Sequence, residues 1–429
     1  MADKKVKIHL SARRGLPKRH GISKLTLSAT ILIIAVIIAI FVAFYIYSRP
    51  VTEEKVLKIG VITPLTGALS YGGNDLKQGA ELAAEEINSQ GGIKVGNTIY
   101  KIQLIIEDDE GKPDKGTLAA QKLITQDNVF AIVGSYSSTV TLAMQPTIME
   151  NKRLLVVPVA VATKITDAGY KYTFRVCANQ RMQTTQNAEW VYNNLKPKTF
   201  AVLLENSDYG REGGQIWSSY MESRGVKKLA EEYFNIGSVD FYSQLSKIKA
   251  ADPDVIFTIA NTNDAANILK QAKEIGLNKQ FVMLGGVAMD EFLKLAGENA
   301  LGLVHLSYFE ATSKRPKVVA FVDAFKKRWG RSPAMYAAGA YDAVYAIKYA
   351  IEKAGKLDVD AVADAMRTLD FEGVQGRIFF DDKGQAQTKV LVVQVQRVQD
   401  GVNGLGRVIL YPPEDKQGDY IPLEALKKG

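Results

Sequence analysis

Two segments carry residues that could bind a small polar or anionic group: FAIVGSYSST at residues 130–139 and LLVVPVAVAT at residues 154–163. Each begins as an apolar, β-branched run, as strands buried on both faces do, and then changes to small or hydroxylic residues. The pattern of residues 139–150 predicts a helix, so Ser137 and Ser138 lie where a helix presents free N–H groups and its positive dipole end. In an open parallel sheet, ligands bind outside the carboxyl ends of the strands. The two segments predict one wall of a small-molecule site, with an ordinary helix cap and turn as the alternative.

Residues suited to catalysis or metal binding are few. The sequence contains three histidines, and only His305 lies beyond the first 20 residues, within an apolar run that favours a packed structural imidazole. A histidine-based triad or zinc site is hard to build from this set, and the G-x-S-x-G, Walker-type and post-strand G-x-G-x-x-G motifs do not occur. The acidic run at residues 107–110 could hold a divalent cation, but solvated charge is the simpler interpretation. We expect a protein that binds its ligand without converting it and has no metal ion or cofactor.

The formal net charge of +8 is concentrated at one end of the 429-residue chain. Residues 1–24 hold eight lysines and arginines against one aspartate, which leaves +1 for all the rest. A nearly neutral body argues against nucleic-acid binding, which needs a basic surface. The composition, with 47% hydrophobic and 23% charged residues, is that of a globular protein with room for two or three domains.

Residues 25–47 form an uncharged run that is rich in Ile, Val, Ala and Phe. As a helix this run would extend roughly 35 Å, enough to cross a bilayer core of about 30 Å. We predict a transmembrane signal-anchor helix with a basic cytoplasmic tail before it (residues 1–24) and a short linker after it (residues 48–56), so the body lies outside the cytoplasm. A cleaved signal peptide is the alternative. The single cysteine, Cys177, is far from this run, which excludes a lipoprotein attachment there and any intrachain disulfide.

The remaining sequence alternates strand-like and helix-like patterns. A first series has predicted strands at residues 56–63, 101–107, 130–133 and 154–157, with helices between them. After residues 173–176, a second series has predicted strands at 199–204, 229–234, 255–260, 281–284 and 303–307, again with interleaved helices. Three helices follow at 317–329, 335–354 and 359–368, and hairpin-like strands begin after Gly376. We therefore expect an α/β fold of two doubly wound, parallel-sheet lobes with a ligand cleft between them.

Six motifs resemble those of the branched-chain amino-acid (Leu/Ile/Val) type of ABC-transporter solute-binding protein: TPLTGALSYGG, GAELAAEEINSQGGI, IIEDDEGKPDKG, GSYSST, ENSDYGREGG and AAGAYDAVYAI. The similarity runs in order from Lys58 to about Val398. It implies a type I periplasmic-binding fold, in which two lobes joined by three crossovers close on a ligand. Lobe I would comprise residues 57–174 and 305–373, and lobe II residues 175–304 and 374–425, with crossovers near residues 173–176, 303–307 and 373–376.

The resemblance also implies ligand-binding positions. Tyr71 matches an aromatic residue that lines the cleft after the first strand. Ser138, next to Ser137, matches the serine that binds the ligand's α-carboxylate, and Ala160 matches a residue that contributes its backbone beside it. Tyr209 matches the aromatic residue of the second lobe.

Three positions depart from the family's pattern. Val161 replaces a threonine, Asn261 replaces a tyrosine, and Gly285 stands where the family has the glutamate that pairs with the ligand's α-ammonium. A buried ammonium without an opposite charge costs several kcal/mol, so either another acid substitutes or the ligand lacks an α-ammonium. We favour the second option, which predicts a carboxylate, an amide or another small polar solute. The candidate substitutes for the first option are Asp208, Asp264, Asp290 and Glu310.

These observations predict a membrane-anchored, extracytoplasmic solute-binding component of an ABC importer, which binds a small amino acid or a related carboxylate or amide. Its expected partners are that solute and an ABC permease in the membrane, with no nucleic acid. A ligand-binding sensor subunit of a separate signalling protein is the alternative. An extracytoplasmic enzyme is disfavoured by the missing catalytic groups.

Overall fold

The computed structural model describes residues 24–47 and 53–426 of the chain. They fall into two compact units, which are the helix α1 (Lys24–Tyr47) and a body that begins at Glu53. The predicted basic tail, apart from Lys24, and the predicted linker up to residue 52 lie outside the described residues, and residues 53–56 belong to the first strand of the body. Within the described ranges, no helix combines the length and the hydropathy of a membrane-spanning segment, so the structure does not support the predicted transmembrane helix.

The first half of the body is built on a six-stranded sheet in the order β2-β3-β1-β4-β5-β6. Its strands are parallel except β2, which pairs antiparallel with β3. Buried side chains alternate between its faces: Val133 and Val156 pack in the core of α2 and α12, and Leu155 packs against α3 and α4. The strands are β1 (Glu53–Thr63), β2 (Ile93–Val95), β3 (Thr98–Asp108), β4 (Ala131–Gly134), β5 (Leu154–Val157) and β6 (Thr173–Arg175). The helices are α2 (Ser70–Ser89), α3 (Pro113–Thr125), α4 (Ser138–Glu150), α5 (Lys164–Asp167), α11 (Pro316–Trp329), α12 (Met335–Ala354) and α13 (Val359–Arg367).

The second half is built on a seven-stranded sheet in the order β16-β15-β11-β10-β9-β7-β8. Strands β7 to β11 pair in parallel, and the late strands β15 and β16 extend the sheet in the antiparallel sense. The strands are β7 (Thr199–Glu205), β8 (Lys227–Phe234), β9 (Val255–Ala260), β10 (Gln280–Gly285), β11 (Val304–Ser307), β15 (Leu391–Val402) and β16 (Leu405–Tyr411). The helices are α6 (Gln180–Leu195), α7 (Asp208–Glu222), α8 (Tyr242–Ala251), α9 (Thr262–Glu274), η1 (Gly286–Ala288), α10 (Asp290–Ala296), η2 (Gly297–Ala300) and α14 (Leu423–Leu426).

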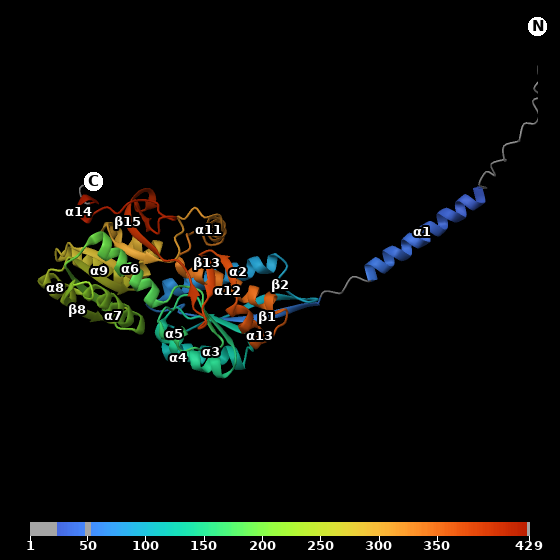
Figure 1. The fold of residues 1–429 in the computed structure, drawn as a ribbon, viewed down its shortest axis with the longest axis horizontal. Helices are drawn as coiled ribbons and strands as arrows, with labels where there is room; N and C mark the ends of the chain where they lie inside the picture. The colour runs from blue at the N-terminus through green and yellow to red at the C-terminus, as the bar shows by residue number, and fades with distance from the viewer. Residues whose placement is uncertain (1–23, 48–52, 427–429) are drawn as a thin grey trace, which may run out of the picture. The chain divides into compact units, whose positions relative to one another are not determined.

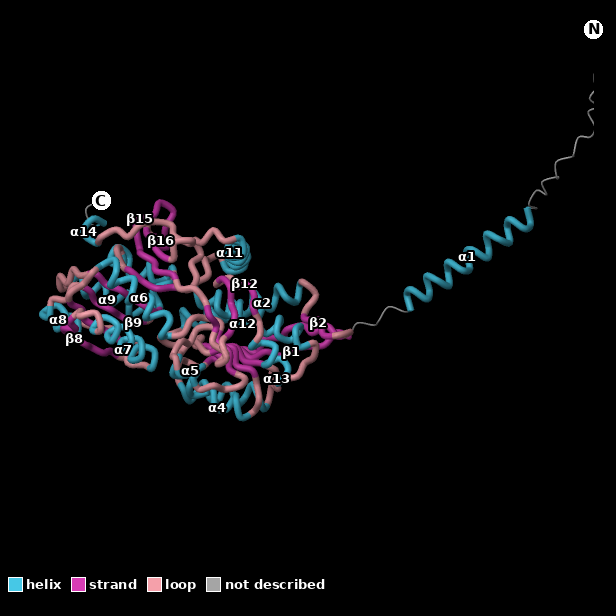
Figure 2. The backbone as a smooth tube through the Cα atoms, in the orientation of Figure 1, coloured by secondary structure: helices cyan, strands magenta, loops and turns pink. Residues whose placement is uncertain are grey.

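A third, antiparallel sheet consists of β12 (Asp370–Gly373), β13 (Gly376–Phe380) and β14 (Ala386–Gln387). Its residues Val374, Ile378 and Ala386 pack in the core that contains α12, so this sheet belongs to the first half. Each half therefore combines early and late parts of the chain, as the blue, cyan and orange segments of the first half and the green, yellow and red segments of the second show in Figure 1. In Figure 2 the strands of each half lie among the helices that cover them. The predicted α/β fold with two parallel sheets is confirmed.

Candidate ligand-binding site

A cavity lies where the carboxyl ends of strands from the two large sheets meet. Residues that follow β4 and β5 line it from the first half, and residues at the ends of β7, β9 and β10 line it from the second. Its volume is about 50 Å³, several times the roughly 10–15 Å³ that one water molecule needs. We name it the cleft cavity, and its lining comprises Leu69, Tyr136, Ser137, Ser138, Val159, Val161, Gln183, Glu205, Ser207, Tyr209, Ile236, Asn261, Gly285, Tyr308, Met335 and Tyr336.

The first-half wall of the cavity presents the N-terminus of α4. Ser137 is the N-cap, and its hydroxyl oxygen accepts a hydrogen bond from the backbone N–H of Val140 at 3.4 Å. The Ser138 hydroxyl oxygen accepts bonds from the backbone N–H groups of Val161 at 3.2 Å and Ala162 at 3.1 Å, which joins the two segments singled out in the sequence. Because this oxygen already accepts two bonds, the Ser138 hydroxyl hydrogen is the group left for an acceptor in the cavity. Together with the dipole of α4, it makes this wall favour a negatively charged or acceptor group.

A buried arginine holds the loop that follows β5. Arg175, the last residue of β6, donates to the carbonyl oxygens of Ala160 at 3.1 Å and Ala162 at 2.8 Å, and its Nε donates to Gln385 Oε1 at 2.7 Å. Burial lowers the pKa of the guanidinium to about 10, which keeps it charged at neutral pH. These charge-assisted bonds fix the first-half wall in place.

The second-half wall is centred on Glu205, the last residue of β7. Glu205 is 4% exposed, and its carboxylate accepts hydrogen bonds from Ser207 Oγ and from Asn261 Nδ2, both at 2.6 Å. Asn261 Oδ1 in turn accepts a bond from the Tyr136 hydroxyl at 3.1 Å, so a polar chain runs from the first half to Glu205. A carboxylate oxygen has two lone pairs, so each oxygen of Glu205 can accept a further bond from a donor in the cavity.

Burial raises the pKa of Glu205 to about 7, and the neighbouring carboxylate of Asp264 adds to the rise, whereas the hydrogen bond from Ser207 opposes it. Among the described residues that line the cleft cavity, Glu205 is the one charged side chain. A buried carboxylate without a cationic partner is costly. The electrostatics of this wall therefore favour a donor or cationic group, the opposite of the first-half wall.

Four tyrosines line the cavity, namely Tyr136, Tyr209, Tyr308 and Tyr336. The rings of Tyr136 and Tyr336 pack edge to face with centroids 4.9 Å apart, and the Tyr336 hydroxyl donates to the carbonyl oxygen of Gly285 at 2.8 Å. Tyr308 is 2% exposed, and its hydroxyl has no hydrogen-bond partner within the described part of the chain. Because buried hydroxyls are normally bonded, the Tyr308 hydroxyl is a further place for a polar ligand atom.

Hydrogen bonds between the two halves close the cavity. The Tyr136–Asn261 and Tyr336–Gly285 bonds cross it directly. Outside the lining, Thr139 Oγ1 donates to Asp208 Oδ2 at 2.8 Å. The backbone N–H of Thr163 donates to Glu212 Oε2 at 2.9 Å. The structure therefore shows the body in a closed arrangement, with both halves in contact around one cavity.

Six of the eight site residues predicted from sequence line the cavity, and these are Ser137, Ser138, Val161, Tyr209, Asn261 and Gly285. Ala160 is buried beside the cavity, and its carbonyl oxygen is bound by Arg175. Tyr71 lies outside the lining and is 41% exposed. Helix α2 begins at Ser70, and this places Tyr71 on its outer side while Leu69 lines the cavity.

The four acids considered as substitutes for the family's glutamate lie outside the lining and bind other groups: Asp208, Asp264, Asp290 and Glu310. The last two form ion pairs with the buried Arg407, at 2.6 and 3.1 Å respectively. The acid of the cavity is Glu205, which the sequence reasoning missed. Its one local signal is its place at the end of a strand, in ENSDYG.

The glycine at the family's glutamate position is required by the backbone. Gly285 has a φ of +105°, which side chains rarely adopt, and a Cβ atom built on it would lie 2.5 Å from the carbonyl oxygen of Ala260. A side chain at residue 285 would therefore force β9 and β10 to move. The departure from the family's pattern is built into the fold of this chain.

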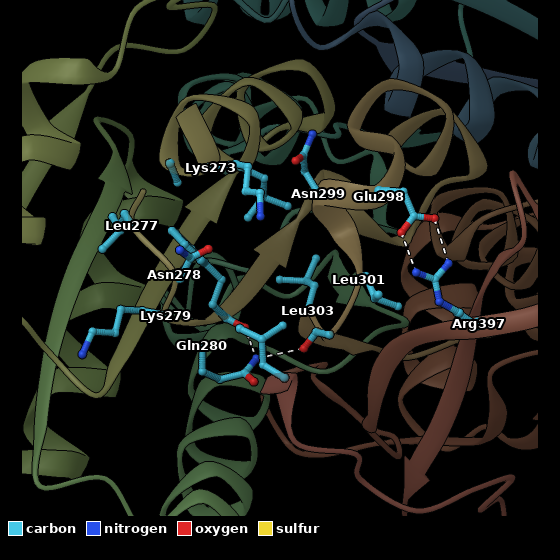
Figure 3. A pocket seen from close by; sticks show the side chains of 15 residues that line it. Lys273, Leu277, Asn278, Lys279, Gln280, Glu298, Asn299, Leu301, Leu303 and Arg397 are labelled. Atoms are coloured by element: carbon cyan, nitrogen blue, oxygen red, sulfur yellow. Dashed lines mark hydrogen bonds and ion pairs between the residues drawn. The ribbon is translucent and has the colours of Figure 1, made fainter. Parts of the chain in front are cut away.

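A second cavity, of about 300 Å³, lies at the opposite end of the strands of the second half (Figure 3). Gln280 at the start of β10 and Leu303 before β11 line it, and Glu298 pairs with Arg397 at 3.0 Å beside them. Its lining residues all belong to the second half, so closure of the two halves would not enclose a ligand there. The cleft cavity, which both halves line, is the better candidate for the ligand.

Comparison with known protein families agrees with this geometry. The profile of the periplasmic binding protein family matches residues 56–402. A leucine-, isoleucine-, valine-, threonine- and alanine-binding protein of Pseudomonas aeruginosa is 31% identical over 328 residues, which cover 76% of this chain and 86% of that protein.

Two solved structures are similar over nearly their whole length. The branched-chain amino acid transporter substrate-binding protein LivJ of Streptococcus pneumoniae, in complex with isoleucine, superposes with a TM-score of 0.75 at 27% identity, covering 83% of this chain and 100% of that one. A solute-binding protein of an ABC transporter from Rhodopseudomonas palustris BisB5, in complex with 3,4-dihydroxybenzoic acid, has a TM-score of 0.75 at 25% identity, covering 86% and 98%. With its two parallel sheets, its shared cavity and these matches, this chain belongs to the periplasmic binding protein family, in the branched-chain amino-acid (Leu/Ile/Val) group.

Proposed function

We propose that this chain is the solute-binding component of an ABC importer and that it binds a small amino acid, or a related carboxylate or amide, in the cleft cavity. The observation that carries the proposal is a cavity at the strand ends that is lined by both halves and closed by hydrogen bonds between them. A solute there touches both halves only when they are closed. Binding therefore shifts the population toward the closed form, which a permease can distinguish from the open one.

The two halves are the proposed lobes of a hinge. We place the crossovers between β6 and α6, after β11, and between β14 and β15, since the strands change sheet at these points. The third crossover then falls at residues 388–390 and not near residues 373–376, because β13 and β14 pack in the core of the first half. A hinge of three chain segments allows the lobes to rotate as rigid bodies while each keeps its own core.

The ligand class is supported by the relatives. One similar structure holds isoleucine and another holds 3,4-dihydroxybenzoic acid, so the shared fold accommodates both amino acids and aromatic carboxylates. Four tyrosines and several aliphatic side chains in the lining suit an apolar side group of either kind.

We further propose that the body works outside the cytoplasm, anchored beside its permease. The support is the family and the sequence itself, in which the uncharged residues 25–47 follow a basic flank. Anchoring would raise the effective concentration of the body near its partner. We expect the full-length chain to stay in membranes washed with carbonate. A chain that starts at Glu53 should be released. Release of both would contradict the anchor without affecting the binding proposal.

Calorimetric titration tests the binding function. The full-length chain, purified in mild detergent, is titrated with amino acids, their amides, and aliphatic and aromatic carboxylates. We expect at least one solute to bind with 1:1 stoichiometry and, at one hundred times its Kd, to raise the free energy of unfolding by about 2.7 kcal/mol. A panel without any binding would contradict the proposal, and turnover of a bound solute would indicate an enzyme instead.

A further inference from the structure

We propose that Glu205 binds a cationic nitrogen of the solute, so that the ligand is a zwitterionic amino acid and not a plain carboxylate or amide. This inference rests on the proposed function, since it assigns a ligand class to the cleft cavity. It also reverses the expectation drawn from Gly285 alone. The acid that is missing at residue 285 is supplied by a different strand.

Glu205 lies on the same sheet edge as Gly285, two strands away. Strand β7 pairs with β9, and β9 pairs with β10, so the pairs Leu204–Ile259 and Ala260–Gly285 set the three carboxyl ends side by side. Neighbouring strands are separated by about 4.8 Å, so the acid is displaced by roughly 10 Å along the wall. Glu205 and Gly285 nevertheless line one cavity.

The surroundings of Glu205 form a built site. Ser207 and Asn261 each donate a hydrogen bond to its carboxylate and leave one acceptor position on each oxygen. Helix α7 approaches so closely that a Cβ atom at Gly210 would lie 2.9 Å from Glu205 Cγ and 2.0 Å from its carbonyl oxygen. The carboxylate is therefore buried and held at a defined position with acceptor capacity that the protein leaves unused.

The groups that face Glu205 do not neutralise it. They are neutral or acidic, and they come from α7, from the start of α9 and from the first half: Ser207, Tyr209, Asn261, Asp264 and Tyr136. Lysine and arginine are absent from the described lining of the cavity. An ammonium group of the solute would provide the missing cation, whereas a second carboxylate would be repelled.

The opposite wall suits the other end of an amino acid. The Ser138 hydroxyl and the N-terminus of α4 offer donors to a carboxylate, as Glu205 offers acceptors to an ammonium. A zwitterion satisfies both walls at once. A deaminated carboxylate or a decarboxylated amine would leave one of the two walls without its partner.

Titration with matched trios tests the assignment. The full-length chain in mild detergent is titrated at pH 8 with L-leucine, 4-methylpentanoate and 3-methylbutylamine, and with L-phenylalanine, 3-phenylpropanoate and 2-phenylethylamine. We expect an amino acid to bind more tightly than its two analogues. Glu205→Gln should weaken amino-acid binding about 30-fold or more, the usual loss for a buried charge pair, and should leave the deaminated carboxylate unchanged or bound more tightly. The control is Glu222→Gln, which removes a charge from the exposed C-terminal end of α7, outside the lining of the cleft cavity and away from the bonds between the halves.

A pH titration of the unmodified chain gives a second test that does not depend on the variant. Burial raises the pKa of Glu205 to about 7, and the residue must lose its proton to pair with an ammonium. Amino-acid binding should therefore tighten about tenfold between pH 6 and pH 8, while binding of 4-methylpentanoate should weaken. Flat amino-acid binding over this range, unchanged binding by Glu205→Gln, or a preference for the deaminated analogue would each overturn the inference and leave the solute-binding function intact. If neither these trios nor the wider panel binds, both proposals fail.

Discussion

The two walls of the cleft cavity share one construction and have opposite chemistry. Each wall consists of a parallel strand end followed by a helix with a serine N-cap, Ser137 on α4 and Ser207 on α7. In the first wall, the Ser138 hydroxyl oxygen accepts hydrogen bonds from two backbone N–H groups, and its hydrogen remains available as a donor to a group in the cavity. In the second wall, Ser207 donates to Glu205, which keeps acceptors for the cavity. The residue at the strand end, such as Glu205, can therefore decide whether the wall beside a helix N-terminus favours a negatively or a positively charged ligand group.

The largest expected effect comes from the edge of the second wall. Gly285→Ala should lower the free energy of unfolding by about 4 kcal/mol, because it combines backbone strain with overpacking against Ala260. Gly330→Ala is the control: Gly330 also has a positive φ, +69°, but nothing lies within 4 Å of its added Cβ. We expect that control to lose about 1 kcal/mol in urea unfolding. If both variants lost the same free energy of unfolding, the close contact of residue 285 with Ala260 would not contribute to the cost.

The charge of the second wall should appear in the pH dependence of stability. The pKa of Glu205 is about 7 in the folded chain against 4.5 for an ordinary glutamate. Its contribution to stability is therefore complete below pH 4.5 and is lost as the pH rises through 7. Between pH 5 and pH 8, the free energy of unfolding of the ligand-free chain should fall by about 2.5 kcal/mol more than that of the Glu205→Gln variant. Urea unfolding measures both proteins at both pH values. An equal fall in the unmodified chain and in Glu205→Gln would contradict a buried Glu205 without a cationic partner.

The first wall can be tested by removing the hydroxyl that joins its two segments. Ser138→Ala leaves the backbone N–H groups of Val161 and Ala162 without their acceptor, so the free energy of unfolding should fall by about 2 kcal/mol. Ser137→Ala removes only a helix cap, for which about 1 kcal/mol is expected. Chemical denaturation at pH 7 measures both. If Ser137→Ala lowered the free energy of unfolding more than Ser138→Ala does, the helix cap would be the main structural element of this wall.

The smallest effect should come from one of the two hydrogen bonds that cross the cavity, Tyr136–Asn261. Tyr136→Phe removes the hydrogen bond to Asn261 and keeps the ring against Tyr336. A loss of about 1 kcal/mol predicts roughly fivefold weaker solute binding. Calorimetry measures the affinity, and small-angle scattering should show a larger open fraction. Tyr220→Phe, outside the lining, serves as control, and an equal change in that variant would argue against a specific role of Tyr136.

Local sequence signals predict much of this fold and the main polar residues of the first wall of the cavity. The alternation of strands and helices predicts both parallel sheets, since period and turn residues are visible in short windows. Ser137 and Ser138 are found because a helix start after a buried strand has its own signal. Tyr71 lies outside the lining because it belongs to the first turn of α2, and its position in that turn decides which way its side chain points.

The residues that sequence reasoning misses are those positioned by distant parts of the chain. Tyr308 follows β11 and Tyr336 lies near the start of α12, and both reach the cavity because they pack in the core of the first half. Glu205 looks like the ordinary end of a strand. Its role becomes visible only when its burial, its neutral neighbours and its distance in the sheet from Gly285 are seen together.

The bonds Thr139–Asp208 and Thr163–Glu212 join the halves without involving any residue of the cavity lining. In the proposed hinge motion, a solute enters or leaves while these bonds are broken, so their strength would act on the rates of capture and release together. Under this proposal the two bonds would set how long a solute stays bound, and the cavity walls would set which solute binds. For the proposed carrier, which releases its solute repeatedly, dwell time and selectivity would thus depend on different residues of the same interface.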